Sequence, residues 1–252
     1  MFVRKTSRHA AILKQAADTG SVDVAELAAS LGVSGATIRR DLQSLSADRL
    51  LVRTHGGAVL DGGQELSVRI KETRYQDEKR RIGRASAALI EDGAVVGITG
   101  GSTALELARA LADRRGITVV TNAINIAAEL ATHSAITLVI VGGIVQPSFE
   151  TIGPAAEAML DNYFLDIAFI GVDGLSAQEG CTTYREMAAQ MDRNFLDRAR
   201  RTVIIADSSK IGRATFARIV PLTRVHDIVT DTGANPAQVR ELSESGIRIH
   251  AV

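Results

Sequence analysis

The sequence predicts an α/β fold in which an N-terminal winged helix-turn-helix domain is followed by a Rossmann-like, mostly parallel α/β domain. Two short amphipathic helices joined by a glycine-containing turn are expected within residues 24–45, and a hairpin pattern follows them. From residue 94 onward, short β-branched runs alternate with helical segments, which is typical of a parallel sheet covered on both faces. The expected boundaries are a first domain over 1–60, a linker over 61–76 and a second domain over 77–252.

The two short helices carry their own start and stop signals. Asp23 stands where the first helix needs an N-cap, Gly32 where it ends, and Ser34 where the second helix begins. In both helices the apolar residues recur every three or four positions and form one stripe. The stripes are Val24, Leu27, Ala28 and Leu31 in the first helix and Ile38, Leu42 and Leu45 in the second. An earlier helix, over 7–19, is expected to pack across the pair.

The outward face of the second helix combines small and basic side chains, as a recognition helix does. After it, residues 50–53 suit a strand and His55-Gly56-Gly57 a tight turn, which together predict a wing. The alternative interpretation is an ordinary helical pair in a protein-binding domain. The residues expected to contact DNA are Ser34, Ala36, Thr37, Arg39, Arg40, Gln43, Arg53, His55 and Gly56.

Charge is distributed unevenly, although the whole chain is neutral. Residues 1–60 hold eight Lys or Arg and five Asp or Glu, a net charge of +3, while residues 61–252 hold 21 and 24, a net charge of −3. This asymmetry has the sign expected of a DNA-binding head. Arg4, Lys5 and Arg8 are expected either to contact phosphates or to form a solvated basic terminus.

Composition excludes several classes of protein. A single cysteine, Cys181, rules out an intrachain disulfide and is expected to be buried filler rather than a nucleophile. The histidines other than His55 show no metal-ligand spacing, so no metal, cofactor or catalytic residue is predicted. With neither a signal core nor an apolar run that could span a bilayer, the chain is expected to be cytoplasmic and to have no membrane partner.

The second domain is expected to begin with a helix over 77–90 and to continue as alternating strands and helices. The candidate strands are 94–99, 117–121, 136–141, 167–172, 202–206, 227–230 and 248–252. The candidate helices are 102–112, 124–131, 155–160, 186–200 and 236–244. In open α/β sheets ligands bind beyond the carboxyl ends of the strands, so the residues that follow each strand are candidates for a site.

Polar or glycine-rich segments follow five of these strands. The first strand leads into Gly100-Gly101-Ser102-Thr103 at the start of a helix, where backbone amides and two hydroxyls can hold a phosphate. The other strand ends supply Asn122, Gly142-Gly143, Asp173 and Lys210. A dinucleotide fits less well, because the loop lacks G-x-G-x-x-G spacing and no acidic residue closes the second strand. A small phosphorylated ligand is therefore expected.

Six segments of the sequence carry a resemblance to a known family. They are TIRRDLQSL and LLVRTHGGAV in the first domain, and VTNAINIAAELA, VIVGGIVQPSFETIGPAA, FIGVDGLSAQEGCTT and IIADSSKIGRATFARIVPL in the second. In these segments the chain resembles the DeoR family of bacterial transcription regulators. This resemblance implies a sensor domain similar to ribose-5-phosphate isomerase that binds phosphorylated sugars or related metabolites. By this resemblance Gly101, Ser102 and Thr103 hold the phosphate. The residues implied to face the sugar are Asn122, Gly142, Gly143, Asp173 and Lys210.

Two loops depart from the family pattern. Many members carry an Asp-Ser-Gly-Thr-Thr type loop, whereas Thr99 to Thr103 read Thr-Gly-Gly-Ser-Thr here and lack a carboxylate that could bind sugar hydroxyls. Members also carry Asn and two glutamates after a Thr-Thr pair, whereas Glu186 alone follows here, displaced by about one position. Gly100 and Glu186 complete the predicted effector residues. Tyr184 and Arg185 either contact a different ligand or pack.

These features predict a DNA-binding repressor of a sugar or polyol catabolic operon that a phosphorylated metabolite relieves. The alternative is a phosphosugar isomerase with an added DNA-binding domain, but Asp173-Gly174 continues as Leu175-Ser176-Ala177, without the acid that base catalysis needs. A CoA-transferase-like relative needs an activated glutamate that has no assigned place. The expected partners are operator DNA, a phosphorylated sugar and further copies of the chain, as a dimer or tetramer. The sequence leaves open the metabolite, the operator, and repression versus activation.

Overall fold

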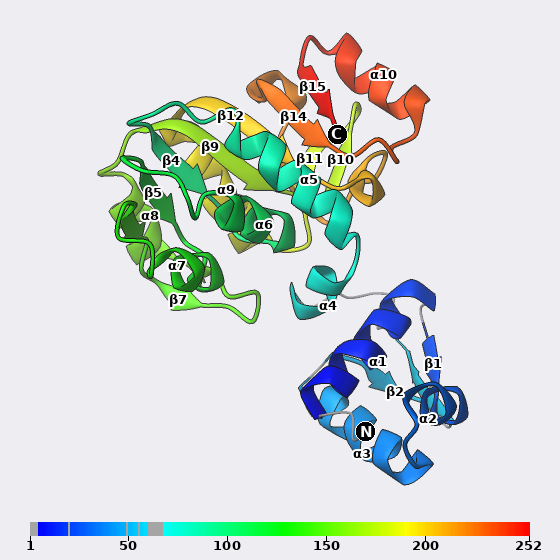
Figure 1. Ribbon diagram of the computed structural model, residues 1–252. Coiled ribbons are helices and arrows are strands. Elements are labelled where there is room, and N and C mark those ends of the chain that lie inside the picture. Colours follow the sequence, from blue (N-terminus) through cyan, green and yellow to red (C-terminus); the bar gives the residue numbers. More distant parts are fainter. Residues whose placement is uncertain (1–4, 20, 49, 55, 60–67) are drawn as a thin grey trace. The chain divides into compact units, whose positions relative to one another are not determined.

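The computed structural model describes residues 5–19, 21–48, 50–54, 56–59 and 68–252. By its internal contacts the chain divides into two compact units, Met1–Gln76 and Asp77–Val252 (Figure 1). The predicted linker over 61–76 is not wholly irregular, because a short helix, α4 (Val68–Thr73), lies within it and contacts the first helix of the chain.

Three helices and a three-stranded antiparallel sheet make up most of the described part of the first unit. The helices are α1 (Lys5–Thr19), α2 (Val24–Leu31) and α3 (Gly35–Ala47). The strands are β1 (Ser21–Asp23), β2 (Val52–Arg53) and β3 (Gly57–Val59). Their order in the sheet is β1-β3-β2, so β2 and β3 form a wing hairpin that β1 extends.

The apolar stripes of the three helices meet in one core, which includes Ile12, Leu27 and Ile38. Leu50 and Leu51 are predicted to begin a strand, but both are buried in this core and the strand begins at Val52. Neighbouring side chains of a strand point to opposite faces, so a regular strand could not have placed both in the same core.

A seven-stranded sheet organises the second unit, all of whose residues are described. Its strands are β4 (Val95–Ile98), β5 (Thr118–Thr121), β6 (Thr137–Ile140), β9 (Leu165–Gly171), β12 (Ala199–Ile205), β14 (Asp227–Thr230) and β15 (Arg248–Ala251). The order across the sheet is β15-β14-β12-β9-β4-β5-β6, and every neighbouring pair is parallel. The predicted strands and the predicted fold class are confirmed.

Helices cover both faces of this sheet. One core receives side chains from α5 (Gln76–Ala87), α6 (Ser102–Ala110) and α7 (Ile124–Leu130). The other receives them from α8 (Pro154–Leu160), α9 (Glu186–Arg198) and α10 (Pro236–Glu244). Consecutive residues of β9 are buried in different cores: Phe169 packs in the core with α5, α6 and α7, and Ile170 packs in the core with α8, α9 and α10. Burial on both faces explains why the inner strands of the sheet contain short continuous apolar runs.

The sequence pattern does not predict two small antiparallel elements. A hairpin of β7 (Ile144–Val145) and β8 (Thr151–Ile152) follows β6. A three-stranded sheet joins β10 (Gly174–Ser176), β11 (Gly180–Thr183) and β13 (Ala217–Val220), while two short 3-10 turns lie at Ser208–Lys210 (η1) and Leu222–Arg224 (η2). Strands this short carry no periodicity of their own. The hairpin and β10 follow the carboxyl ends of β6 and β9, and so add side chains to the edge where a ligand is expected.

Candidate DNA-binding surface and effector site

Side-chain and backbone caps fix the turn between α2 and α3. The Asp23 carboxylate accepts hydrogen bonds from the amides of Ala25 (2.7 Å) and Glu26 (3.2 Å). Gly32 ends α2 with a left-handed φ of 64°, and Ser34 caps α3. The expected caps are confirmed, and together they set where the recognition helix begins.

One face of α3 is exposed and the other is buried. The exposed residues are Ala36, Arg39, Arg40 and Gln43, and those buried on the opposite side are Ile38, Leu42 and Leu45. Arginine and glutamine on a helix surface can donate paired hydrogen bonds to base edges, and a small residue lets the helix approach closely. The helical phase therefore agrees with the predicted set of DNA contacts.

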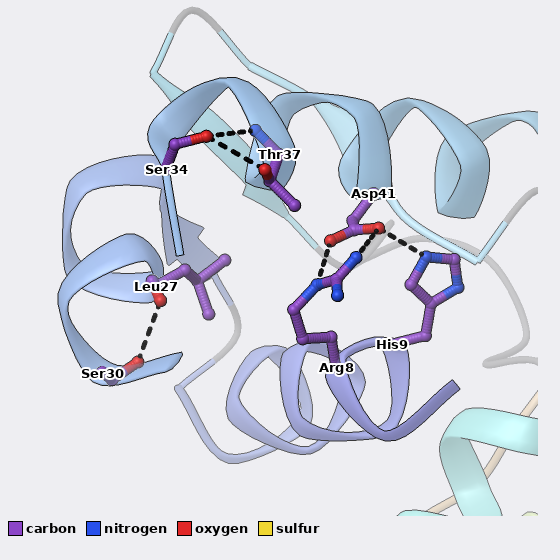
Figure 2. A network of polar contacts seen from close by, with 7 residues as sticks. All are labelled: Arg8, His9, Leu27, Ser30, Ser34, Thr37 and Asp41. Atoms are coloured by element: carbon purple, nitrogen blue, oxygen red, sulfur yellow. Dashed lines mark hydrogen bonds and ion pairs between the residues drawn. The ribbon is translucent and has the colours of Figure 1, made fainter. Parts of the chain in front are cut away.

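Ser34 and Thr37 lie together at the first turn of α3. The Thr37 amide donates to Ser34 Oγ at 3.2 Å, and the two hydroxyl oxygens are 2.9 Å apart (Figure 2). Ser34 is exposed and Thr37 is half-buried. Both hydroxyls therefore sit at the helix N-terminus, where a DNA phosphate gains most from the helix dipole.

The wing is tied closely to α2. The Thr54 amide donates to the Gly57 carbonyl at 3.1 Å, and the Val24 amide donates to the Gly56 carbonyl at 3.0 Å. A Cβ at Gly57 would overlap the Val22 carbonyl, so only glycine fits there. Arg53 and Gly56 are exposed, as DNA contacts require. The predicted contact at His55 lies outside the described residues.

Arg8 has a role inside the first unit. Its Nε donates to Asp41 Oδ2 at 2.7 Å and its Nη2 donates to Asp41 Oδ1 at 3.0 Å, while His9 Nε2 lies 3.1 Å from the same Oδ1 (Figure 2). Burial opposes ionisation of Asp41, but the Arg8 hydrogen bonds outweigh it and hold the pKa of this carboxyl below its usual value. Arg8 therefore reaches from α1 to α3 rather than extending as a solvated basic terminus.

In the second unit, the loop between β4 and α6 has the shape of an anion cradle. Gly101 stands at the N-cap of α6 with a φ of 121°, and no side chain caps the helix. Ser102 and Thr103 begin the helix and are largely buried. The first amides of a helix have no partner within the helix, and with two hydroxyls beside them they can bind a phosphate.

Glu150 supplies a carboxylate to this loop from a distant part of the sequence. A Cβ at Gly100 would overlap the Glu150 carboxylate, so the absence of a side chain at Gly100 makes room for it. Ser148 Oγ donates to Glu150 Oε2 at 2.8 Å, and Glu150 forms a β-bridge with Ala123. The turn of the β7–β8 hairpin thus places an acid beside a loop that has none of its own.

Two further carboxylates join Glu150, and the three are called the carboxylate cluster (Glu150, Asp173 and Asp192). Thr183 Oγ1 donates to Asp173 Oδ2 at 3.0 Å. Burial raises the pKa of Asp192 well above its usual value, the charges of Glu150 and Asp173 raise it further, and a hydrogen bond with Thr99 opposes the shift. Asp192 is therefore protonated over a wider pH range than an exposed aspartate.

The sequence reasoning missed Glu150 and Asp192. Asp192 had a detectable signal, because it shares the buried face of α9 with Ala189, Phe195 and Leu196, where a carboxylate is unusual. Glu150 had none, because its position depends on a hairpin too short to predict.

Asn122 follows β5, the strand next to β4, and is almost fully buried. Its Nδ2 donates to the Thr151 carbonyl at 3.0 Å, while Oδ1 has no hydrogen-bond partner among the described residues. Gly142 and Gly143 are exposed and lead from β6 into the β7–β8 hairpin. The carboxyl ends of β5, β4, β9 and β12 therefore bring Asn122, the Thr99–Thr103 loop, Asp173 and the turn containing Lys210 to one edge.

The last two predicted effector residues differ in their surroundings. Lys210 ends η1, is half-buried, and lies in a turn that Asp207 caps by accepting from the Ser209 amide at 3.1 Å. Glu186 is exposed at the first residue of α9, where its carboxylate pairs with Arg193 Nη2 at 2.9 Å. Lys210 thus stands at the strand edge, whereas Glu186 forms an ion pair on its own helix.

Helix α5 contacts both α6 and the turn that carries Lys210. Lys79 Nζ lies 3.9 Å from Asp207 Oδ2, and both side chains are buried. Farther along α5, a Cβ at Gly83 would lie 2.6 Å from the Glu106 carbonyl, so α5 and α6 approach each other closely, as Figure 1 shows. The first helix of the second unit is thus packed against α6 and against the turn that carries Lys210.

Family models match both units. A DeoR-like helix-turn-helix domain matches residues 8–63, and a DeoR C terminal sensor domain matches residues 74–232. The chain belongs to the DeoR family.

Curated DeoR-family relatives align along almost the whole chain. The HTH-type transcriptional repressor GlcR of Bacillus subtilis is 31% identical over 96% of this chain and 94% of its own length. The glycerol-3-phosphate regulon repressor of Haemophilus influenzae is 30% identical over 90% of each chain. These relatives are named transcriptional repressors, so this DeoR-family member is a transcription regulator rather than an enzyme.

Among solved structures, ribose 5-phosphate isomerase A from Methanocaldococcus jannaschii is 22% identical, with a TM-score of 0.42. The alignment covers 54% of each chain, so this chain spans about half the length of that enzyme.

Three properties of the described residues bear on chemistry outside the proposed sites. Cys181 is buried, and burial raises the pKa of its thiol, so it is not poised as a nucleophile. Within the described ranges, no group of three or more His, Cys, Asp or Glu side chains could hold a metal ion. No helix in the same ranges is long and apolar enough to cross a bilayer.

Proposed function

We propose that this DeoR-family regulator represses a sugar or polyol operon by binding operator DNA through α3 and the β2–β3 wing, and that a phosphorylated metabolite releases it. The observation that carries the DNA-binding part is the division of α3 into an exposed face with Arg39, Arg40 and Gln43 and a buried apolar face. The name of the Haemophilus influenzae relative supports a phosphorylated polyol or sugar as the signal.

The charge pattern at the strand edge narrows the class of effector. The N-terminal amides of α6, with Ser102 and Thr103, favour a phosphate at one end of the ligand. The carboxylate cluster disfavours a second anionic group but accepts hydrogen bonds from hydroxyls. A monophosphate with several hydroxyl groups, such as a sugar or polyol monophosphate, meets both requirements, whereas a bisphosphate or a phosphorylated acid does not.

Release of DNA requires the ligand to distinguish two states of the protein. Helix α5 is the first element of the second unit and contacts both α6, the helix that begins at the proposed phosphate site, and Asp207, in the turn that carries Lys210. We assign α5 the role of carrying effector occupancy toward the DNA-binding unit, which precedes it in the chain.

Self-association through the second unit is part of the same proposal, because dimers are the usual route by which a single winged domain gains operator specificity. Ile144 and Val145 are exposed on the hairpin next to β6, the last strand of the sheet, which supports an interface there. Light scattering at micromolar concentration should give at least a dimer. We also place the protein in the cytoplasm, where bacterial operators are found.

Two experiments test the proposal. In vitro selection from random duplexes should enrich one sequence, which the protein then retards in a gel-shift titration. A thermal-shift screen of sugar and polyol monophosphates should reveal one that stabilises the protein by about 2.7 kcal/mol at a hundred times its Kd. The unphosphorylated compounds and inorganic phosphate serve as controls. Failure to enrich any sequence would refute DNA binding, and shifts no larger than those of inorganic phosphate would refute the effector class.

A further inference from the structure

The Arg8–Asp41 ion pair is a strongly directional element of the contact between α1 and α3. Arg8 and Asp41 lie 33 residues apart, and their side chains are 12% and 4% exposed. A guanidinium and a carboxylate joined by two hydrogen bonds accept only a narrow range of relative orientations. His9 Nε2, 3.1 Å from Asp41 Oδ1, restricts the same carboxylate further (Figure 2).

The apolar part of the packing of α3 is less directional than this ion pair. Ile38, Leu42 and Leu45 hold α3 against the core through apolar burial, which depends on area and tolerates small rotations of a helix. Asp41 lies directly after Arg40 and two residues before Gln43, so any rotation of α3 that moves Asp41 moves both exposed side chains with it. Successive residues of an α-helix are separated by about 100° around its axis. Fixing Asp41 therefore fixes where Arg40 and Gln43 point.

We propose that Arg8 and Asp41 are positioning residues whose ion pair sets the rotation of the recognition helix and so aligns Arg40 and Gln43 with base edges. Neither side chain contacts DNA in this role. In this role Arg8 does not bind a DNA phosphate. It contributes to sequence-specific binding and not to the general attraction of the protein to DNA. This role rests on the proposed binding of DNA by α3.

The test uses the full chain and the duplex selected by the wild type, beside a scrambled duplex of equal length. Three variants are compared: Arg8→Gln, Asp41→Asn and the double variant. Lys14→Gln is the control, since it removes one exposed positive charge from α1. Affinity is measured over a range of salt concentrations, because each phosphate contact adds about 1 to the slope of log affinity against log salt. Thermal unfolding checks that every variant folds.

Asp41→Asn separates the positioning role from a general effect of charge most sharply, because the two predict changes of opposite sign in the affinity for DNA. Removing a negative charge from a DNA-binding domain should tighten binding to a polyanion if only net charge matters. Positioning instead predicts that Asp41→Asn and Arg8→Gln each weaken the selected duplex on the order of tenfold, the scale of one impaired base contact. Salt slopes should stay at wild-type values, and scrambled-duplex affinity should change much less than selected-duplex affinity, least of all in the double variant, which keeps the net charge. The double variant should be no worse than either single one, because both act on one contact.

Several results would overturn the inference while leaving the proposed function intact. Arg8→Gln that lowers the salt slope by about 1, with Asp41→Asn binding more tightly, would make Arg8 a phosphate contact. Unchanged affinity in all three variants would show that the apolar contacts suffice. Unfolding of all three would assign the pair to stability. If the wild type enriches no duplex, the proposed function itself fails.

Discussion

The exposed face of α3 and the strand edge of the second unit offer different physical conditions for the binding proposed at each. Arg39, Arg40 and Gln43 come from one short stretch and are exposed, whereas Thr99 and Asp192 come from distant segments and are buried. An exposed basic face suits a hydrated polyanion, and its affinity depends strongly on salt. A buried polar site selects a small ligand, because every hydrogen bond that the ligand fails to make leaves a buried group unsatisfied. The difference teaches that the two functions should be separable by mutation.

The largest expected effect concerns the exposed face alone. Arg40→Ala should lower affinity for the selected operator by about 1–3 kcal/mol, the discrimination that one bidentate arginine–guanine contact supplies. The thermal shift caused by the effector should not change. Gel-shift titration and thermal shift measure the two quantities, with Arg240→Ala, exposed on α10, as the control. A fall in effector response would contradict the independence of the two regions.

An intermediate effect is expected where the two regions communicate. Lys79→Met should leave operator and effector affinities close to wild type but lower their coupling by about 0.5–2 kcal/mol, because the buried contact between α5 and Asp207 is lost. The double variant Lys79→Met/Asp207→Asn avoids an unpaired buried carboxylate and should behave alike. Arg84→Met removes an exposed charge from the same helix and serves as the control. Operator release that matches wild type in both Lys79 variants would rule out this route.

The smallest effect concerns the buried edge alone and depends on pH. Because the pKa of Asp192 is raised in the folded state, its contribution to stability is present below the unfolded pKa of about 3.9 and is lost as the pH rises through the folded value. Asp192→Asn mimics the protonated acid, so its Tm should exceed that of the wild type at pH 8 and approach it at pH 4. Asp197→Asn, exposed on the same helix, is the control. A wild-type Tm equal to or above that of Asp192→Asn at pH 8 would contradict the raised pKa.

The same contrast explains how much the sequence predicts. Caps such as Asp23 and Ser34 and the phase of α3 are set within a few residues, so local patterns predict them. The seven parallel strands are predictable because most contain a short β-branched run and because they alternate with helical segments. The fold class and the helix-turn-helix follow from these local signals.

Contacts between distant segments could not be predicted in this way. The pairing of Arg8 with Asp41 spans 33 residues, and Glu150 reaches Gly100 only because a short hairpin folds there. Neither contact leaves a periodic trace in the sequence, since each depends on how whole elements pack. The Thr99–Thr103 loop itself contains no carboxylate, as its sequence shows. The fold nevertheless places the carboxylates of Glu150 and Asp192 beside this loop, from two other segments.

Operator release by the effector tests the central claim most directly. Release is measured against the concentration of the compound that gives the largest thermal shift, for the wild type and for Ser102→Ala/Thr103→Ala. Thr132→Ala/Ser134→Ala removes two exposed hydroxyls from the opposite edge of the sheet as a control. The wild type and the control should release operator over the same range of ligand concentration. Ser102→Ala/Thr103→Ala should need at least several-fold more ligand, as expected when charge-assisted hydrogen bonds are lost. In the absence of ligand, this double variant should bind operator as tightly as the wild type. Superimposable release curves for all three proteins would contradict a phosphate site at the start of α6.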